Sequence, residues 1–78
     1  MAYTVYRDHT IVSSAICDQV SGKWKLAAFV TWPAGESASR VKFLKSSPEV
    51  FSRFEDAVDA GIETSKNWVD ARLLSKAH

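Results

Sequence analysis

The sequence predicts one α+β domain, in which a three-stranded antiparallel β-meander is covered on one face by a C-terminal α-helix at about residues 53–71. Apolar and polar residues alternate from Trp24 to Trp32, as in a half-buried strand. After Ser52, apolar residues recur at spacings of three and four, as in an amphipathic helix. The 78 residues, 46% of them hydrophobic, suffice for one core. We expect a single domain over residues 1–78, ordered at about 6–71 and with mobile termini.

The first expected strand runs from about Thr10 to Asp18 and is rich in β-branched residues. Ser13 and Ser14 interrupt its alternation, a pattern typical of a β-bulge. The stretch from Val20 to Lys23 then predicts a hairpin turn, because Gly22 can adopt the positive φ that tight hairpins require.

The second expected strand, Lys23 to Trp32, places its even-numbered residues on the core face and its odd-numbered residues on the outer face. Pro33 and Gly35 end this strand. The third expected strand, Ser39 to Leu44, puts Val41 and Phe43 on one side and its other residues outside. The sequence therefore predicts an outer face with the following candidate contact residues: Lys25, Phe29, Thr31, Arg40, Lys42 and Leu44.

The expected helix follows a connection or short helical turn at residues 46–49. Ser52 and Glu55 have the spacing of a capping box. Its apolar stripe consists of Phe54, Ala57, Val58, Gly61, Ile62, Ser65, Trp68 and Val69. Glycine costs about 1 kcal/mol inside a helix relative to alanine. Gly61 on this stripe therefore indicates a close approach to the sheet, where we expect an aromatic side chain.

Several short motifs recur in a family that the chain resembles. They are Tyr6, Gly22-Lys23-Trp24, Phe51-Ser52, Glu55-Asp56-Ala57, Ala60-Gly61 and Trp68-Val69-Asp70. In this order they resemble a family of small, uncharacterised bacterial β-β-β-α domains, over roughly Tyr6 to Asp70. The resemblance implies the β-β-β-α layout. It transfers no catalytic or ligand-binding residue, because the family has no established activity.

No catalytic or metal-binding group stands out in the sequence. His9 and His78 are the two histidines, and a metal site needs further ligands that the pattern does not place beside them. Asp8 and His9 could serve as a base for a nucleophile on the same strand, which would be Ser13, Ser14 or Cys17. Residues of one strand alternate between faces, however, and no oxyanion loop is evident.

Activity through convergence of distant residues stays open, for example through His9, Asp18 and Glu36. The acidic residues of the expected helix are typical of a solvated face; they are Glu55, Asp56, Asp59 and Glu63. Glycines stand singly, so no phosphate-binding loop is present. We expect no enzyme, no cofactor, no metal and no small-molecule ligand.

Composition bounds the compartment and the partners. The single cysteine, Cys17, allows no internal disulfide, and no apolar run approaches the ~20 residues of a membrane span, so we expect a cytoplasmic protein without a membrane partner. Residues 1–46 carry six basic and three acidic side chains, a net charge of +3, and residues 47–78 carry four and six, a net charge of −2. This asymmetry could steer an anionic partner to the sheet.

The outer face of the sheet is the expected functional surface, because one helix leaves the opposite face of the sheet open. The leading hypothesis is a non-enzymatic protein-interaction module that binds another protein or a second copy of itself through this face or through a strand edge. The alternative hypothesis is a nucleic-acid-binding accessory domain, in which Phe29 stacks on bases and the basic residues contact phosphates.

Overall fold

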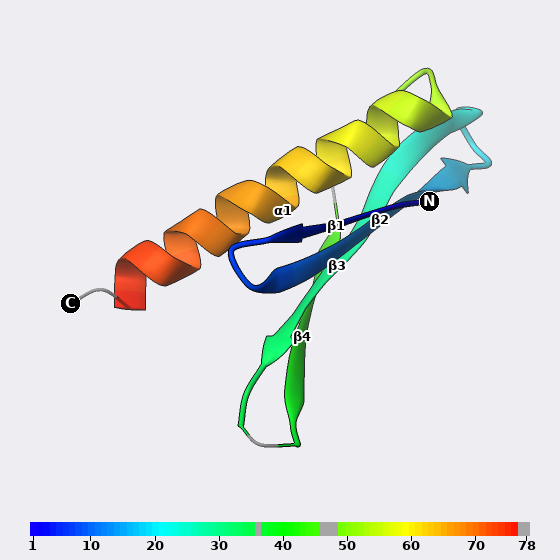
Figure 1. Ribbon diagram of the computed structural model, residues 1–78. Coiled ribbons are helices and arrows are strands. Elements are labelled where there is room, and N and C mark those ends of the chain that lie inside the picture. The colour runs from blue at the N-terminus through cyan, green and yellow to red at the C-terminus, as the bar shows by residue number, and fades with distance from the viewer. Residues whose placement is uncertain (36, 46–48, 77–78) are drawn as a thin grey trace.

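The computed structural model describes residues 1–35, 37–45 and 49–76 and shows an antiparallel four-stranded sheet with one long helix on one of its faces (Figure 1). The strands are β1 (Ala2–Tyr6), β2 (His9–Asp18), β3 (Lys23–Pro33) and β4 (Ser39–Lys45), in that order across the sheet, and α1 (Phe54–Lys76) comes last. The predicted α+β class, the meander and the C-terminal helix are confirmed. The sheet has four strands, however, where the sequence predicted three.

The additional strand is β1, which pairs with β2 from Ala2 opposite Ser13 to Tyr6 opposite His9. A two-residue turn joins these strands. Its residues Arg7 and Asp8 have φ values of 52° and 65°, the left-handed conformation of the hairpin turns that match the twist of a sheet. Glycine or asparagine usually marks such a turn, so an Arg-Asp pair did not indicate a hairpin in the sequence.

The strands β2 and β3 form the centre of the sheet and follow the expected pattern. The even-numbered residues of β3 from Leu26 to Val30 are buried beneath α1, as predicted. Ile11 of β2, Val30 of β3 and Val69 of α1 are fully buried and form the core cluster. Gly22 has the predicted positive φ, 72°, in the hairpin between the two strands.

Aromatic pairs hold the helix against the sheet at its first turn and in its C-terminal half. Trp24 meets Phe54 edge to face with a centroid distance of 5.2 Å, and Trp32 lies 5.2 Å from Trp68. Such pairs contribute about 0.5–1.5 kcal/mol beyond their buried area. Both sheet tryptophans therefore point toward the helix, as the alternation in β3 predicted.

Small residues bring the middle of the helix close to the sheet. A Cβ atom added at Gly61 would meet the hydroxyl of Ser13 and would lie 3.2 Å from the Cβ of Ser13 and 3.4 Å from that of Ala28. The buried Ser13 hydroxyl donates a 2.7 Å hydrogen bond to the carbonyl of Val58, and Ser65 donates one of 2.7 Å to the carbonyl of Gly61. The expected close approach is therefore present, but its partners are Ser13 and Ala28, and the prediction of an aromatic partner was wrong.

The predicted bulge in β2 is absent, since β2 pairs with β3 without an extra residue at Ser13 and Ser14.

The residues before the helix differ from the predicted start. The Arg53 carbonyl accepts a 3.3 Å hydrogen bond from the Ala57 N–H, so the helix begins one residue later than a cap at Ser52 requires. No hydrogen bond of Ser52 to the helix is formed within the described residues.

The chain returns from β4 to β3 before the helix begins. Phe51 and Trp24 exchange two backbone hydrogen bonds of 2.7 Å each, which places the end of this connection beside the start of β3. Most of the connection or helical turn predicted at residues 46–49 falls on residues 46–48, which lie outside the described residues.

A second contact joins the β1–β2 hairpin to the C-terminal half of the helix. The Tyr6 hydroxyl donates to the two carboxylate oxygens of Asp70, at 2.9 and 3.0 Å, and Arg7 Nη1 donates to Oδ1 at 2.7 Å. The hydrogen bonds from Arg7 and then from Tyr6 hold the pKa of Asp70 below its usual value. The hydrogen bond to Asp70 raises the pKa of Tyr6.

Substitution of Gly61 tests the close approach. Gly61→Ala gains about 1 kcal/mol of helix propensity, but its Cβ would displace the Ser13 hydroxyl from the Val58 carbonyl, at a cost of about 1–3 kcal/mol for the buried group and the strain. We expect a lower melting temperature for Gly61→Ala and a still lower one for Gly61→Leu.

A double-mutant cycle supplies the control. Ser13→Ala removes the hydroxyl that the new Cβ would meet, so Gly61→Ala should cost less free energy in the Ser13→Ala background than in the wild type. Urea unfolding of the four proteins measures the difference. An unchanged melting temperature for Gly61→Leu, or equal costs of Gly61→Ala in both backgrounds, would contradict the close approach.

Acid unfolding tests the Asp70 contact. A carboxylate with a lowered pKa in the folded state stabilises the protein above its unfolded-state pKa of about 3.9, and this contribution is lost as the pH falls through the folded-state pKa. Asp70→Asn should therefore be less stable than the wild type at neutral pH, and the difference should shrink in acid. Urea midpoints against pH measure it, with the exposed Asp59→Asn as the control. A difference that does not vary with pH would refute the role of the charge.

Candidate interaction surface

The candidate functional surface is the face of the sheet that α1 does not cover, which we call the outer face. Residues directly opposite each other in an antiparallel pair point to the same side of a sheet, so the strand register assigns its members. Among the residues whose side chains the structure describes, they are Tyr3, Val5, Thr10, Val12, Ser14, Ile16, Asp18, Lys23, Lys25, Ala27, Phe29, Thr31, Pro33, Ser39, Val41 and Phe43.

The outer face is strongly apolar and open to solvent. Five of its large apolar side chains are between 50% and 69% exposed; they are Tyr3, Val5, Ile16, Val41 and Phe43. They come from three of the four strands, and Val12 and Phe29 lie between them. Its described charged members are Asp18, Lys23 and Lys25, which lie toward the β2–β3 hairpin. Exposed apolar patches of this extent mark interaction sites in soluble proteins.

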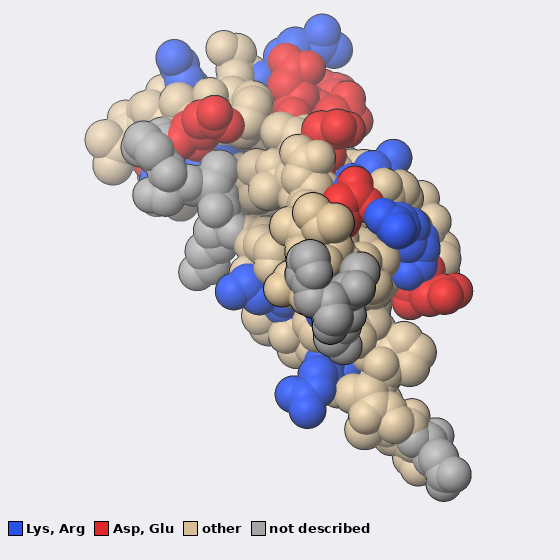
Figure 2. Space-filling view, turned by 90° about the vertical axis from the view of Figure 1, so that its left-hand side faces the viewer, with Lys and Arg blue, Asp and Glu red and all other residues tan. Residues whose placement is uncertain are grey.

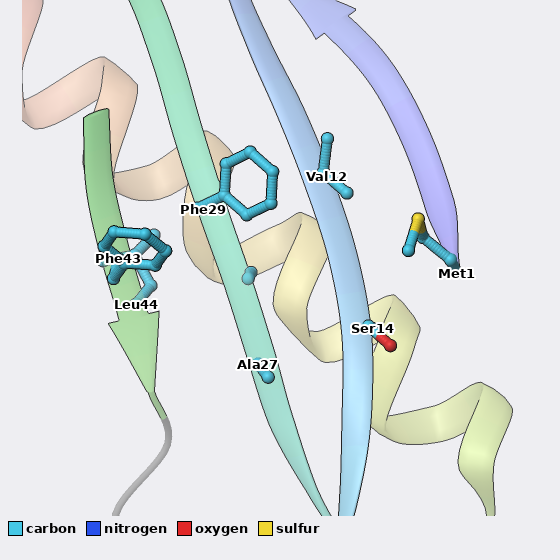
Figure 3. Close-up of a pocket in the computed structure, with 8 residues that line it drawn as sticks. Met1, Val12, Ser14, Ala27, Phe29, Phe43 and Leu44 are labelled. Atoms are coloured by element: carbon cyan, nitrogen blue, oxygen red, sulfur yellow. The ribbon is translucent and has the colours of Figure 1, made fainter. Parts of the chain in front are cut away.

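A hollow of about 230 Å³ lies on this face (Figure 3). Phe29 and Phe43 stand on one side of it with a centroid distance of 5.8 Å, and Val12 and Met1 stand on the other. The small side chains of Ser14 and Ala27 also line the hollow, and Figure 3 shows the helix behind the sheet. The hollow therefore has apolar walls that an apolar side chain could contact.

The predicted contact residues divide between the two faces. Lys25, Phe29 and Thr31 lie on the outer face, as expected. The prediction for β4 was wrong, because Arg40 pairs with Trp32 and Lys42 with Val30, both of which point toward the helix.

Leu44 also lies on the helix side, opposite Ala28, and packs against the core cluster. Val41 and Phe43 are the large apolar residues of β4 on the outer face, with Phe43 directly opposite Phe29. A shift of one residue in register moves every side chain of a strand to the other face. The alternation within β4 did not reveal which of its two alternating sets of residues faces the helix. The prediction from the sequence therefore placed Val41 and Phe43 on the helix side. Relative to the prediction, the outer face gains Val41 and Phe43 and loses Leu44 and the two cations.

The residues considered for catalysis serve structural contacts. His9 is buried against Trp32, at a centroid distance of 5.5 Å, and its Nδ1 lies 2.8 Å from the Arg7 carbonyl. A carbonyl only accepts, so Nδ1 is the donor. The Ser13 hydroxyl donates its hydrogen bond to the Val58 carbonyl, and Cys17 is exposed. The described residues thus bring no nucleophile to His9.

The distant residues do not converge with His9 either. His9 and Asp18 are the first and last residues of β2, a separation of about 30 Å at the rise of an extended strand. Asp18 instead accepts hydrogen bonds from the Val20 N–H and the Ser21 hydroxyl in the hairpin, which lower its pKa. Glu36 and His78 lie outside the described residues. Three or more possible metal ligands do not gather anywhere in the described part of the chain.

Comparisons with known proteins found no relative of this chain. Models of protein families, curated proteins and solved structures give no match to this sequence. The resemblance to small bacterial domains therefore stays a prediction. In the described part of the chain no helix combines the length and the apolar character needed to cross a membrane.

Paired alanine substitutions test the assignment of faces in β4. Phe43→Ala should cost less than about 1 kcal/mol in the isolated chain, because Phe43 is 66% exposed, whereas Leu44→Ala should cost about 1–2 kcal/mol because Leu44 packs against the core. Urea unfolding at low protein concentration measures both. If Phe43→Ala proved the more damaging substitution, the assigned register of β4 would be incorrect.

Proposed function

We propose that this chain is a non-enzymatic interaction domain that forms a homodimer by stacking its outer face on the outer face of a second copy. The observation that carries the proposal is the set of five large apolar side chains, each at least half exposed, on one continuous sheet face. Burial of apolar area contributes about 25 cal/mol per Å². A partner on this face would remove from water an apolar surface that the single helix does not cover.

A second copy fits this face because the face is mostly apolar and has both protruding and hollow parts. A two-fold interface requires a surface that complements itself. Phe43 protrudes, and the hollow beside Val12 and Phe29 offers apolar walls to a protruding side chain of the partner. The described charges of the face, Asp18, Lys23 and Lys25, lie at its β2–β3 hairpin end and sum to +1, so two such faces repel each other little. Stacked sheets of this kind pack about 10 Å apart.

The size of the face indicates a weak dimer. Four strands about 4.8 Å apart and paired over about six residues cover roughly 400 Å² per copy before the relief of the side chains is counted. Stable interfaces bury about 800 Å² per partner, and smaller ones are transient. We therefore expect reversible dimerisation in the micromolar range.

The sheet face is a better contact than either strand edge. The edge strands are β1 and β4. Arg40 and Lys42 lie on β4, and pairing of this strand with its own copy would bring like charges together, a common protection of edges. The other edge strand, β1, has five residues. Edge pairing would also leave the apolar face exposed.

Nucleic-acid binding through the outer face, the second hypothesis, has fewer residues to draw on. Phe29 and Lys25 lie on that face, but Arg40 and Lys42 lie on the helix side. The proposal includes a cytoplasmic setting, where the exposed Cys17 thiol would stay reduced. It includes no cofactor, membrane or small-molecule ligand.

Sedimentation of charge-substituted variants tests the dimer. Phe43→Glu places a charge on the outer face and should hold the protein as a monomer across the micromolar range, where the wild type associates. Leu74→Glu is the matched control, because Leu74 is 70% exposed on the helix, away from this face. A wild type that stays monomeric at every concentration, or equal association of both variants, would refute the proposed interface.

A further inference from the structure

The helix side of β4 carries a second surface, which we call the basic strip and define as Arg40, Lys42 and Arg72. Arg40 and Lys42 lie opposite Trp32 and Val30, on the same side of the sheet as α1, and both are exposed. The helix packs mainly on β2 and β3, so this side of β4 stays largely uncovered. The strip does not overlap the outer face.

Arg72 adds the third cation from the helix. Its guanidinium carbon lies 4.5 Å from the centroid of the Trp32 ring, and Trp32 is the cross-strand neighbour of Arg40. A guanidinium stacked on an aromatic ring keeps its N–H donors at the edge of the plane. The ring therefore orients Arg72 and leaves it able to bind an anion beside the two residues of β4.

The described acidic residues in the middle and C-terminal half of α1 lie away from the strip. Asp70 contacts Tyr6 and Arg7, so the side of α1 that carries Asp70 is turned toward β1. Since β1 and β4 are the two edges of the sheet, the other side of α1 is turned toward β4. Helical periodicity puts Asp59 and Glu63 on the Asp70 side. The lower part of Figure 2 accordingly shows Lys or Arg but no described Asp or Glu.

The three cations have no acidic partner within the described residues. The ion pairs found there join Arg7 to Asp70 and Arg53 to Glu55. Arg40 and Lys42 are two residues apart on one face of a strand, so their Cα atoms are about 7 Å apart. Successive phosphates of a nucleic-acid strand have a similar spacing, and arginine binds phosphate with two parallel hydrogen bonds.

We propose that the basic strip binds the phosphate backbone of nucleic acid without reading its sequence. Contacts to phosphates position a protein and carry no sequence information. The enclosed Trp32 ring, which touches His9, Trp68 and Arg72, is not free to stack on a base. Each copy carries its own strip, so binding does not require the dimer, although a dimer would present two strips.

Fluorescence anisotropy with a labelled single-stranded oligonucleotide tests this site. At about 20 mM salt the wild type should bind, and three phosphate contacts predict a slope of log affinity against log salt of about −2. The double variant Arg40→Gln/Lys42→Gln should bind at least about tenfold more weakly and show a smaller slope. Lys23→Gln/Lys25→Gln removes the same charge from the other side of the sheet and should change affinity less than about twofold.

Three results would overturn the proposal. They are no binding at low salt, equal losses in the two double variants, and competition by polyglutamate as strong as that by unlabelled oligonucleotide, which would indicate an acidic protein as the partner. Sedimentation of Arg40→Gln/Lys42→Gln should still show the dimer. Loss of nucleic-acid binding and loss of self-association are therefore separate outcomes.

Discussion

The short distance between α1 and the sheet at Gly61 determines most other features of the structure. There the helix has no side chain, and the hydroxyl of Ser13 fills the space and donates to the carbonyl of Val58. This hydrogen bond joins a strand to the backbone of a helix inside the core, where an unpaired hydroxyl would cost about 1–3 kcal/mol. A larger residue at either position would push the helix outward. The contact therefore fixes the distance between the helix and the sheet, and it fixes which face of the sheet the helix covers.

The position of the helix decides what remains exposed. A close contact at its centre and aromatic pairs at Trp24 and Trp32 hold it over β2 and β3. A single helix cannot also cover β4 or the opposite face. The two uncovered surfaces differ in chemistry, since the outer face is mostly apolar, whereas the helix side of β4 carries Arg40 and Lys42. The proposed self-association and the proposed binding of nucleic acid thus use separate parts of a small domain.

The sequence predicted those features that depend on local periodicity. Alternation identified β3 and its buried face, and spacings of three and four identified the stripe of α1, including the close approach at Gly61. It did not predict β1, because the turn at Arg7 and Asp8 uses two non-glycine residues with positive φ. The run of aromatic and β-branched residues from Tyr3 to Tyr6 is the signal that could have found this strand.

The face of β4 depends on its register with β3, which is a property of the pairing and not of either strand alone. For this reason half of the candidate surface was predicted correctly from the sequence and the other half was assigned to the wrong side. The partner of Gly61 was mistaken for a similar reason, because contacts between elements distant in the chain leave no local pattern. His9 likewise gave no sign in the sequence that it would be buried against Trp32.

Methyl NMR with a soluble paramagnetic probe, recorded at several protein concentrations, gives the sharpest test of whether α1 leaves one apolar face open for a second copy. In dilute solution the probe should broaden the methyl signals of Val5, Ile16 and Val41, and those of Ile11 and Val30 should stay sharp. The first group should become protected as the concentration rises. Broadening of Ile11 and Val30, or outer-face methyls that stay equally accessible at every concentration, would contradict this arrangement.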